Sequence, residues 1–389
     1  MCKTCLRLLL GLIAFWQTTI VAQEPYKFLN EIPIGGEGGW DILTIDSAAS
    51  RLYLSHATKV VVVDLNKNAI AGEITDTPGV HAFMPVPELQ RGFSSNGKES
   101  KSSVVDLNKN AVVGEIADTP GVHGFVTVPE LQRGFSSNGK ESKSSVVDLK
   151  TLKTFLKIDT GESPDAVVYE PLRGEVYIFN HKGNSATVID AKEAKAVATI
   201  PLGGGPEFAA VDETASRIYC NIEDKNEVAV IDTAKHEVIA RWPLAPGDGP
   251  SGIALDAAHH RLFATCHNKM MVMLDTETGK VITTVPIGAG VDGCAFDETA
   301  QLAFASCGEG ITTIAKEEAP EKLSVVQTLK TERGARTMAL DPKTHRIYLP
   351  SAKFQPPPSP SPGVSPARPT IVPNTLKLLV YGPTESAKH

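Results

Sequence analysis

Residues 62–107 read VVDLNKNAIAGEITDTPGVHAFMPVPELQRGFSSNGKESKSSVVDL, and the stretch recurs almost unchanged at residues 104–149. Such near-identity marks a recent duplication, and the displacement of 42 residues gives the length of one structural unit. The same unit continues in diverged form through the rest of the chain. The two copies differ only at Ile70/Val112, Ala71/Val113, Thr75/Ala117, Ala82/Gly124, Met84/Val126 and Pro85/Thr127.

The clearest marker of the repeat is an aspartate that ends a run of β-branched residues. A carboxylate at this point can accept hydrogen bonds from backbone N–H groups two residues on and hold a tight turn. A short polar stretch with lysine follows, and then another apolar run begins. The marker recurs every 42 or 43 residues, at Asp64, Asp106, Asp148, Asp190, Asp232 and Asp275.

Each unit contains four short runs of strand-forming residues, which in the sixth unit are GIALD, RLFATC, MMVMLD and VITTVPIG. No segment keeps a helical periodicity, and units of about 40–45 residues with four strands are typical of propeller blades. We therefore predict an all-β fold, a β-propeller of eight four-stranded blades. The blades are expected near residues 39–77, 78–119, 120–162, 163–204, 205–248, 249–289, 290–334 and 335–381.

The eighth unit shows only three strands, and the segment at residues 26–36 is a lone strand with no unit of its own. We predict that this N-terminal strand completes the last blade, because pairing the two chain ends closes the ring and removes an exposed sheet edge. The near-identical second and third blades span residues 78–119 and 120–162. A proline-rich insert at residues 355–374 interrupts the last blade.

The N-terminal segment has the pattern of an export signal. Lys3 and Arg7 precede the apolar run Leu8–Trp16, which is too short to cross about 30 Å of hydrocarbon as a helix. We expect a signal peptide at residues 1–22 and a single propeller domain at residues 23–389. The protein is then periplasmic or secreted, without a transmembrane anchor, and we expect a monomer.

The net charge of the chain limits the classes of partner that it can bind, and the cysteines bear on its redox state. Loss of the signal removes two positive charges, so the net charge goes from −7 to about −9. An acidic exported protein is a poor candidate for nucleic-acid binding, which needs clustered Lys and Arg. We expect the remaining cysteines to be free thiols packed in strands. They are Cys220, Cys266, Cys294 and Cys307.

The first residues of the innermost strands of a propeller surround its axis at one face. Polar or charged residues stand at all eight of these positions, although the strands that they open are apolar. A glycine or proline shortly before each one makes the turn that directs the side chain inward. This candidate ring consists of Asp41, His81, His123, Asp165, Glu207, Ser251, Asp292 and Arg336.

The loops between second and third strands are expected to add a rim around the same face. Imidazoles and carboxylates that converge there can bind a divalent metal or act as general acid and base. The competing interpretation is that a solvated channel is lined by polar groups because nothing in it needs to be apolar. The rim candidates are His56, Asn96, Asn138, His181, Asn221 and His267.

Catalytic motifs are missing from the sequence: it has no Gly-x-Ser-x-Gly elbow, no His-Glu-x-x-His, no Cys-x-x-Cys-His and no EF-hand loop. We therefore assign no catalytic residue, and we leave the metal of the ring unassigned. His81 and His123 are duplication partners, so the second imidazole can have arisen without selection for metal binding.

Several phrases resemble the exported YVTN-repeat β-propeller family (YncE-like), among them PGVHGF, NIEDKNEVAVID, RWPLAP, NKMMVMLD and RGARTMALDPKTHRIYLP. The resemblance covers essentially the whole mature chain and implies a propeller exported to the periplasm or cell surface. Relatives usually have seven blades with one GVH unit, whereas this chain has the unit twice. One member type binds single-stranded DNA, but the acidic charge and few aromatic residues argue against that here.

The sequence is compatible with three functions. The first is a binding or scaffold protein that presents a polar channel mouth to a small molecule, a peptide or a partner protein. The second is a metal-dependent, lactonase-like hydrolase that uses Asp41, Glu207 or Asp292 together with His81 or His123 and a bound divalent ion. The third is a redox-cofactor propeller in which His123 ligates iron. Fold alone does not decide among them.

Overall fold

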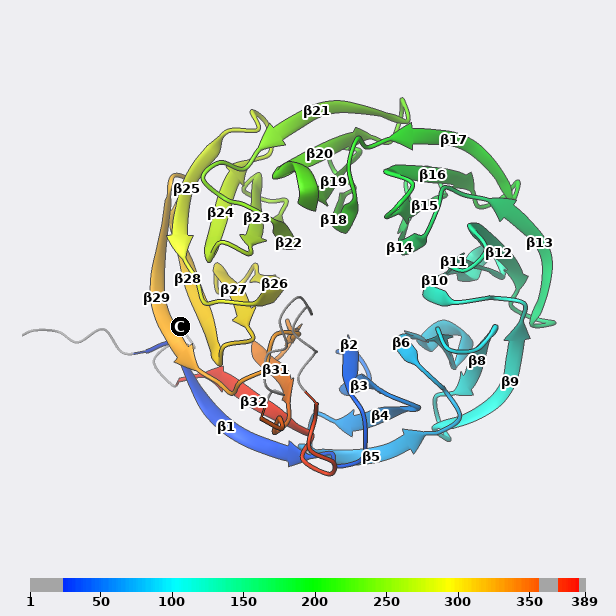
Figure 1. Cartoon of the computed structure of the whole chain (residues 1–389), viewed down its shortest axis with the longest axis horizontal. Helices are drawn as coiled ribbons and strands as arrows, with labels where there is room; N and C mark the ends of the chain where they lie inside the picture. The colour runs from blue at the N-terminus through cyan, green and yellow to red at the C-terminus, as the bar shows by residue number, and fades with distance from the viewer. Residues whose placement is uncertain (1–23, 357–369, 385–389) are drawn as a thin grey trace, which may run out of the picture.

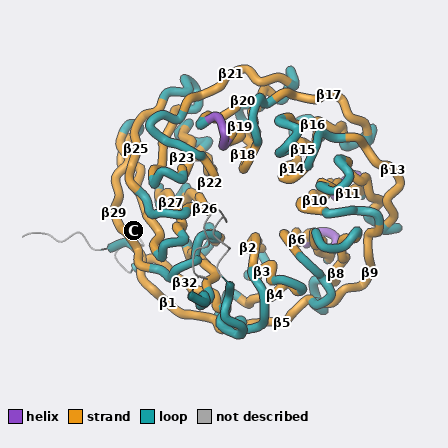
Figure 2. Tube along the Cα trace, viewed as in Figure 1, coloured by secondary structure: helices purple, strands orange, loops and turns teal. Residues whose placement is uncertain are grey.

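The computed structural model describes residues 24–356 and 370–384 and shows eight four-stranded sheets arranged around one axis (Figure 1). The all-β propeller with eight blades is therefore confirmed. Strands dominate the trace in Figure 2, and the helical elements of these residues are three single-turn 3-10 helices. They are η1 (Pro87–Leu89), η2 (Pro129–Leu131) and η3 (Glu223–Lys225).

The first four blades follow one another along the chain, each with its strands in sequence order. Blade one contains β2 (Trp40–Asp46), β3 (Arg51–His56), β4 (Lys59–Asp64) and β5 (Ala69–Ile74). Blade two contains β6 (Val80–Val86), β7 (Arg91–Asn96), β8 (Lys101–Asp106) and β9 (Ala111–Ala117). Blade three contains β10 (Val122–Val128), β11 (Arg133–Asn138), β12 (Lys143–Asp148) and β13 (Lys153–Asp159). Blade four contains β14 (Pro164–Glu170), β15 (Glu175–Asn180), β16 (Ser185–Asp190) and β17 (Lys195–Pro201).

The next three blades repeat this order. Blade five contains β18 (Pro206–Asp212), β19 (Arg217–Ile222), β20 (Glu227–Asp232) and β21 (Glu237–Pro243). Blade six contains β22 (Pro250–Asp256), β23 (Arg261–Cys266), β24 (Met270–Asp275) and β25 (Val281–Pro286). Blade seven contains β26 (Val291–Asp297), β27 (Leu302–Cys307), β28 (Ile311–Ala319) and β29 (Lys322–Lys330).

The eighth blade joins the two ends of the chain. It contains β30 (Ala339–Asp341), β31 (Arg346–Ser351) and β32 (Lys377–Pro383), and β1 (Tyr26–Pro33) is its outermost strand. The antiparallel pairing of β1 with β32 runs from Tyr26 opposite Pro383 to Pro33 opposite Lys377. The predicted closure by the N-terminal strand is thus what the structure shows.

Two of the predicted segments fall partly or wholly outside the described residues: the signal peptide at residues 1–22, and residues 357–369 of the proline-rich insert. The two ends of the insert are described and meet each other. Phe354 forms an antiparallel bridge with Ile371, and the Gln355 N–H donates to the Thr370 carbonyl at 2.7 Å. Within the described residues, no helix is long and apolar enough to cross a bilayer.

The aspartate that marks each repeat ends the third strand of its blade and holds the following turn. In blade one, Asp64 Oδ1 accepts from the backbone N–H groups of Asn66 and Lys67 at 3.0 and 3.1 Å. The same two acceptor bonds recur after Asp106 and Asp148. The predicted role of this carboxylate is confirmed in these blades, and it explains why an aspartate ends the third strand in each of the first six blades.

Because neighbouring strands are antiparallel, each blade has two ends with different contents. The starts of the innermost strands and the turns between second and third strands share one face of the ring, which we call the mouth face. The ends of the innermost strands and the turns between third and fourth strands share the opposite face, which we call the back face.

The hydrophobic core lies between neighbouring blades. Between blades two and three, Phe93 and Phe125 stack with ring centroids 5.2 Å apart inside a cluster of buried aliphatic side chains. Glycine makes room for these rings, since a Cβ at Gly134 would lie 2.4 Å from Cζ of Phe125. The described cysteines form no disulfide, and burial raises the pKa of the Cys266 and Cys307 thiols to about 12.

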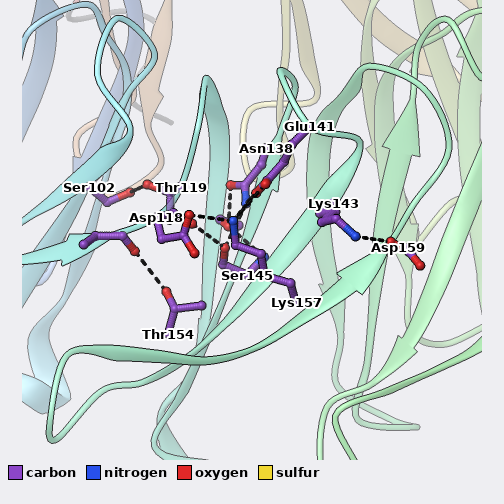
Figure 3. A network of polar contacts seen from close by, with 12 residues as sticks. Ser102, Asp118, Thr119, Asn138, Glu141, Lys143, Ser145, Thr154, Lys157 and Asp159 are labelled. Carbon is purple, nitrogen blue, oxygen red and sulfur yellow. Dashed lines mark hydrogen bonds and ion pairs between the residues drawn. The ribbon is translucent and has the colours of Figure 1, made fainter.

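The duplicated blades are joined by polar contacts as well as by the core (Figure 3). Lys157 in β13 lies 2.7 Å from Asp118 of blade two and 2.8 Å from Glu141 of its own blade. The Ser145 hydroxyl donates across the same boundary to the Asp118 carbonyl at 2.9 Å. The extra blade is therefore integrated into the ring like its neighbours.

Candidate functional site

The predicted ring residues lie at the mouth face, and their positions at the starts of the innermost strands explain this placement. Seven of them occupy the second position of an innermost strand, from Asp41 in β2 to Asp292 in β26, whereas Arg336 precedes the short strand β30. The strand pairing shifts register just after the strand start, for example between Val80 and Phe83 in β6. Such a bulge redirects the side chain that lies within it, here His81.

Four side chains from four consecutive blades form a continuous arc, which we call the DHHD arc: Asp41, His81, His123 and Asp165. His81 Nδ1 lies 2.8 Å from Asp41 Oδ2, and His123 Nδ1 contacts Asp165 Oδ1. The two imidazole rings face each other with centroids 4.2 Å apart and planes 35° apart. All four side chains are between one third and two fifths exposed, so they are open to a ligand.

Within the arc, His123 and Asp165 form a partly buried pair of opposite charges. Burial alone would lower the pKa of His123, but its hydrogen bond to Asp165 and the charges of Asp41 and Glu207 together raise it. Burial would raise the pKa of Asp165, yet the hydrogen bond and charge of His123 lower it. The pair therefore favours imidazolium and carboxylate over the neutral forms.

A second group of acids lies farther around the mouth, in blade five. Burial, followed by the nearby Glu223 carboxylate, raises the pKa of Glu207 to about 7. Helix η3 brings Glu223 there, and His181 and His267 lie 3.5 Å from Glu207 and Glu223 respectively. A cavity of about 270 Å³ opens beside them, lined by His181, Lys182, Asn184, Gly205, Glu223 and Asp224.

The remaining ring positions differ in what they offer. Arg336 Nε lies 3.4 Å from Asp292 Oδ2. Burial raises the pKa of Asp292, and the negative charge of Asp41 across the mouth raises it further. The positive charge of Arg336 lowers the pKa but does not cancel these two effects. Ser251 is only 7% exposed and offers little surface to a ligand.

The predicted rim divides into two sets. His181 and His267 reach the mouth as described, whereas the structure does not place the other four candidates on an exposed rim. Asn96, for instance, is fully buried and donates to the Ser103 hydroxyl at 2.9 Å, because the amide satisfies polar groups between strands. The buried set is His56, Asn96, Asn138 and Asn221.

Sequence reasoning missed Glu223, which is as close to the mouth as the ring residues. Its signal was the polar stretch NIEDKN at the end of the second strand of blade five, where the other blades have a plain turn. A single turn of 3-10 helix there carries the carboxylate toward Glu207.

The arc also satisfies the geometry of a cation site. One ligand atom each from Asp41, His81 and His123 can be chosen so that all three lie within 4.8 Å of one another. A carboxylate oxygen with two imidazole nitrogens is a donor set that suits zinc and similar divalent ions. The mouth can thus bind a ligand by hydrogen bonds and charge, or hold a metal.

Comparisons with known proteins agree with the fold and go no further. No protein-family model matches the chain, and no curated protein matches it. A chain of the hydrazine synthase of Kuenenia stuttgartiensis has a similar structure, with a TM-score of 0.57 and 17% sequence identity over 78% of this chain and 99% of that one. At this identity the likeness shows the fold alone, so the class that is established is an eight-bladed β-propeller.

Proposed function

We propose that this chain is an exported binding propeller of the YVTN-repeat kind, and that its mouth binds a small polar ligand or a peptide. The observation that carries the proposal is the DHHD arc, in which four neighbouring blades present partly exposed, mutually charged side chains. Export rests on the pattern of residues 1–22. Polar side chains alone would line any solvated mouth, but two adjacent imidazoles with a carboxylate on each side are a specific arrangement.

The charge of the mouth favours a ligand with an amino or guanidinium group. Five carboxyl groups surround it, from Asp41, Asp165, Glu207, Glu223 and Asp292, and Arg336 is the fixed cation among the ring residues. A cationic end of a peptide can therefore replace water at the carboxylates, while the imidazoles of the arc donate hydrogen bonds to its carbonyl oxygens.

Isothermal titration of the purified protein with trilysine and with triglutamate tests this proposal. We expect trilysine to bind with a 1:1 stoichiometry that weakens as NaCl is raised, and triglutamate not to bind. The double variant Asp41→Asn/Asp165→Asn should lose at least about tenfold in affinity, or roughly 1.4 kcal/mol. The matched control is Glu237→Gln, a change at an exposed acid of the back face. Equal trilysine affinity in the double variant would refute the proposal.

A metal-dependent hydrolase is the second candidate, favoured by the three convergent ligand atoms of Asp41, His81 and His123. A divalent ion there would orient water and stabilise a developing oxyanion. Protein loaded with ZnCl₂ should then hydrolyse the lactone dihydrocoumarin, and the variant His81→Ala/His123→Ala, treated in the same way, should not. Zinc-loaded protein with no activity above buffer would remove this candidate while leaving the binding proposal intact.

A further inference from the structure

A second cluster of metal-binding side chains lies on the back face, away from the mouth. Asp256 ends β22, His259 lies in the turn that follows, and Glu317 lies near the end of β28 in the next blade. The cluster therefore crosses the boundary between blades six and seven. Nothing in the proposed mouth function uses these three residues.

The three side chains are close enough to share one ion. His259 Nδ1 lies 2.7 Å from Asp256 Oδ2, and one ligand atom from each of the three residues fits within 4.8 Å of the others. The two carboxylates are almost completely covered, with side chains 0% and 5% exposed for Asp256 and Glu317, whereas His259 is 54% exposed. The cluster is thus buried at its acids and open at its imidazole.

The charges around the cluster do not balance. Arg261 is the nearby fixed cation, and its Nη1 lies 2.9 Å from Asp275 Oδ2. Its Nε donates to the Pro320 carbonyl at 2.9 Å and is 3.8 Å from Glu317 Oε1. The basic groups of the cluster are therefore this guanidinium, beside Asp275 and Glu317, and the His259 imidazole, 2.7 Å from Asp256, so that two bases stand against three carboxylates.

One buried oxygen of the cluster lacks a partner. Glu317 Oε2 has no hydrogen-bond partner among the described residues, although the residue is only 8% exposed. Leaving a buried carboxylate oxygen unsatisfied is costly, so such an atom calls for an explanation, for which an ion is a common one.

Among the described residues, this is the one back-face group of three potential metal ligands. The arginine at the start of the second strand behaves as in other blades: Arg261 donates to the Pro320 carbonyl of the next blade, as Arg91 does to Leu149 and Arg217 to Thr276. What differs at this boundary is the added acid. At blade seven the third strand is nine residues long, against six for its counterpart β24, and the extension carries Glu317 to the turn of blade six. The extra acid is therefore placed by a specific lengthening of the chain.

We propose that Asp256, His259 and Glu317 bind one divalent transition-metal ion, which links blade six to blade seven on the back face. Two carboxylates and one imidazole are a donor set for Zn²⁺ or Mn²⁺, whereas Mg²⁺ prefers oxygen ligands and retains its waters. The ion neutralises the surplus negative charge, satisfies Glu317 Oε2 and remains accessible from solvent on the His259 side. Because its ligands come from two blades, it stabilises the ring when bound.

The test uses chelator-treated protein with His81→Ala/His123→Ala, which removes the mouth as a competing metal site. ZnCl₂ and MgCl₂ are titrated calorimetrically into this parent, and into it with Glu317→Gln or His259→Ala added. The matched control adds His260→Asn, the neighbouring exposed histidine of the same turn. His259 is exposed, so its loss tests the ion even if Glu317→Gln perturbs folding.

We expect the parent and the control to bind one Zn²⁺, and Mg²⁺ to bind far more weakly. Glu317→Gln and His259→Ala should each weaken Zn²⁺ binding at least about 100-fold, since even outer-sphere partners of a metal are worth roughly 10–100-fold. Zn²⁺ should also raise the Tm of the parent by several degrees and leave that of the two variants unchanged. Absence of Zn²⁺ binding by the parent would overturn the proposal. Zn²⁺ binding by both variants with the affinity of the parent would overturn it as well.

Discussion

The imidazole rings of His81 and His123 face each other across the boundary between blades two and three, with centroids 4.2 Å apart. The duplication of one blade explains this contact, because it sets the same side chain at the same position of two neighbouring innermost strands. A single GVH unit would give one imidazole between two acids. Two units give an adjacent pair of imidazoles with Asp41 on one side and Asp165 on the other.

The first prediction concerns the pH dependence of the His123–Asp165 pair. The raised pKa of His123 gives stability that is complete below about pH 6.5 and is lost as the pH rises through the folded-state value. The lowered pKa of Asp165 gives stability that is present above about pH 3.8 and is lost as the pH falls through its folded-state value. His123→Gln should therefore destabilise the protein most near pH 5, by an amount on the order of 1 kcal/mol given the partial exposure of the pair.

Urea unfolding at pH 5 and at pH 9 measures this difference. Asp165→Asn should show the same preference for pH 5, and the double variant should lose less than the sum of the two single variants, because both changes remove one interaction. An equal loss at pH 5 and pH 9 for His123→Gln would contradict the pairing.

A second prediction concerns Glu207, whose pKa of about 7 means that the folded state binds its proton more tightly than the unfolded state. Stability from this group is present at low pH and declines as the pH rises from about 4.5 to 7. Glu207→Gln should stabilise the protein at pH 8, on the order of 1 kcal/mol, and have little effect at pH 4. Thermal unfolding at both pH values is the measurement, with the exposed Glu237→Gln as control. A loss of stability at pH 8 would show that the Glu207 carboxylate is held by favourable contacts.

The third prediction concerns the join between the duplicated blades (Figure 3). Lys157 is only 22% exposed and bridges Asp118 and Glu141, so Lys157→Met leaves two acids without their cation. We expect a loss of about 1–2 kcal/mol in the free energy of unfolding, more than an isolated surface pair contributes. Lys59→Met is the matched control, because Lys59 pairs with Glu73 alone and within one blade. Equally small losses in both variants would mean that the core alone joins the copies.

A fourth prediction tests the packing inside the duplicated unit. A Cβ at Gly134 would meet the buried Phe125 ring at 2.4 Å, whereas a Cβ at Gly39 would meet Ile371 at 3.7 Å, an ordinary contact distance. Gly134→Ala should therefore cost about 1–3 kcal/mol by overpacking. Gly39→Ala should cost under about 0.5 kcal/mol, as surface changes usually do. Chemical unfolding of the two variants side by side gives the answer, and similar values would show that Phe125 can move aside.

The fold was predictable because the repeat is marked by short local sequence features. A period of about 42 residues, an aspartate such as Asp64 at the outer turn of the first six blades and an orphan strand at the start of the domain together specify eight blades and their closure. None of these signals depends on knowing which blade contacts which. The inward placement of the ring residues followed from the same order of strands.

The rest of the mouth was not predictable because side-chain direction at a strand end depends on packing. Asn96 is the last residue of β7 and bonds within its sheet, as its counterpart Asn180 does in β15. His181 comes one residue after the end of β15 and reaches Glu207, and periodicity does not fix the end of a strand to one residue. Glu223 depends on a turn of 3-10 helix that periodicity does not reveal. Contacts between blades, such as that of Glu317 with the turn of blade six, have no signature in either blade alone.

An NMR spectrum of ¹⁵N-histidine-labelled protein during a trilysine titration tests directly whether the mouth is the binding site. We predict that the side-chain signals of His81 and His123, assigned from the single variants, shift with a common saturation curve. The signals of His236 and His345, which contact Glu175 and Asp297 on the back face, should stay in place. Shifts confined to the back-face histidines, or no shift of the arc at saturating trilysine, would contradict the assignment of the mouth as the binding site.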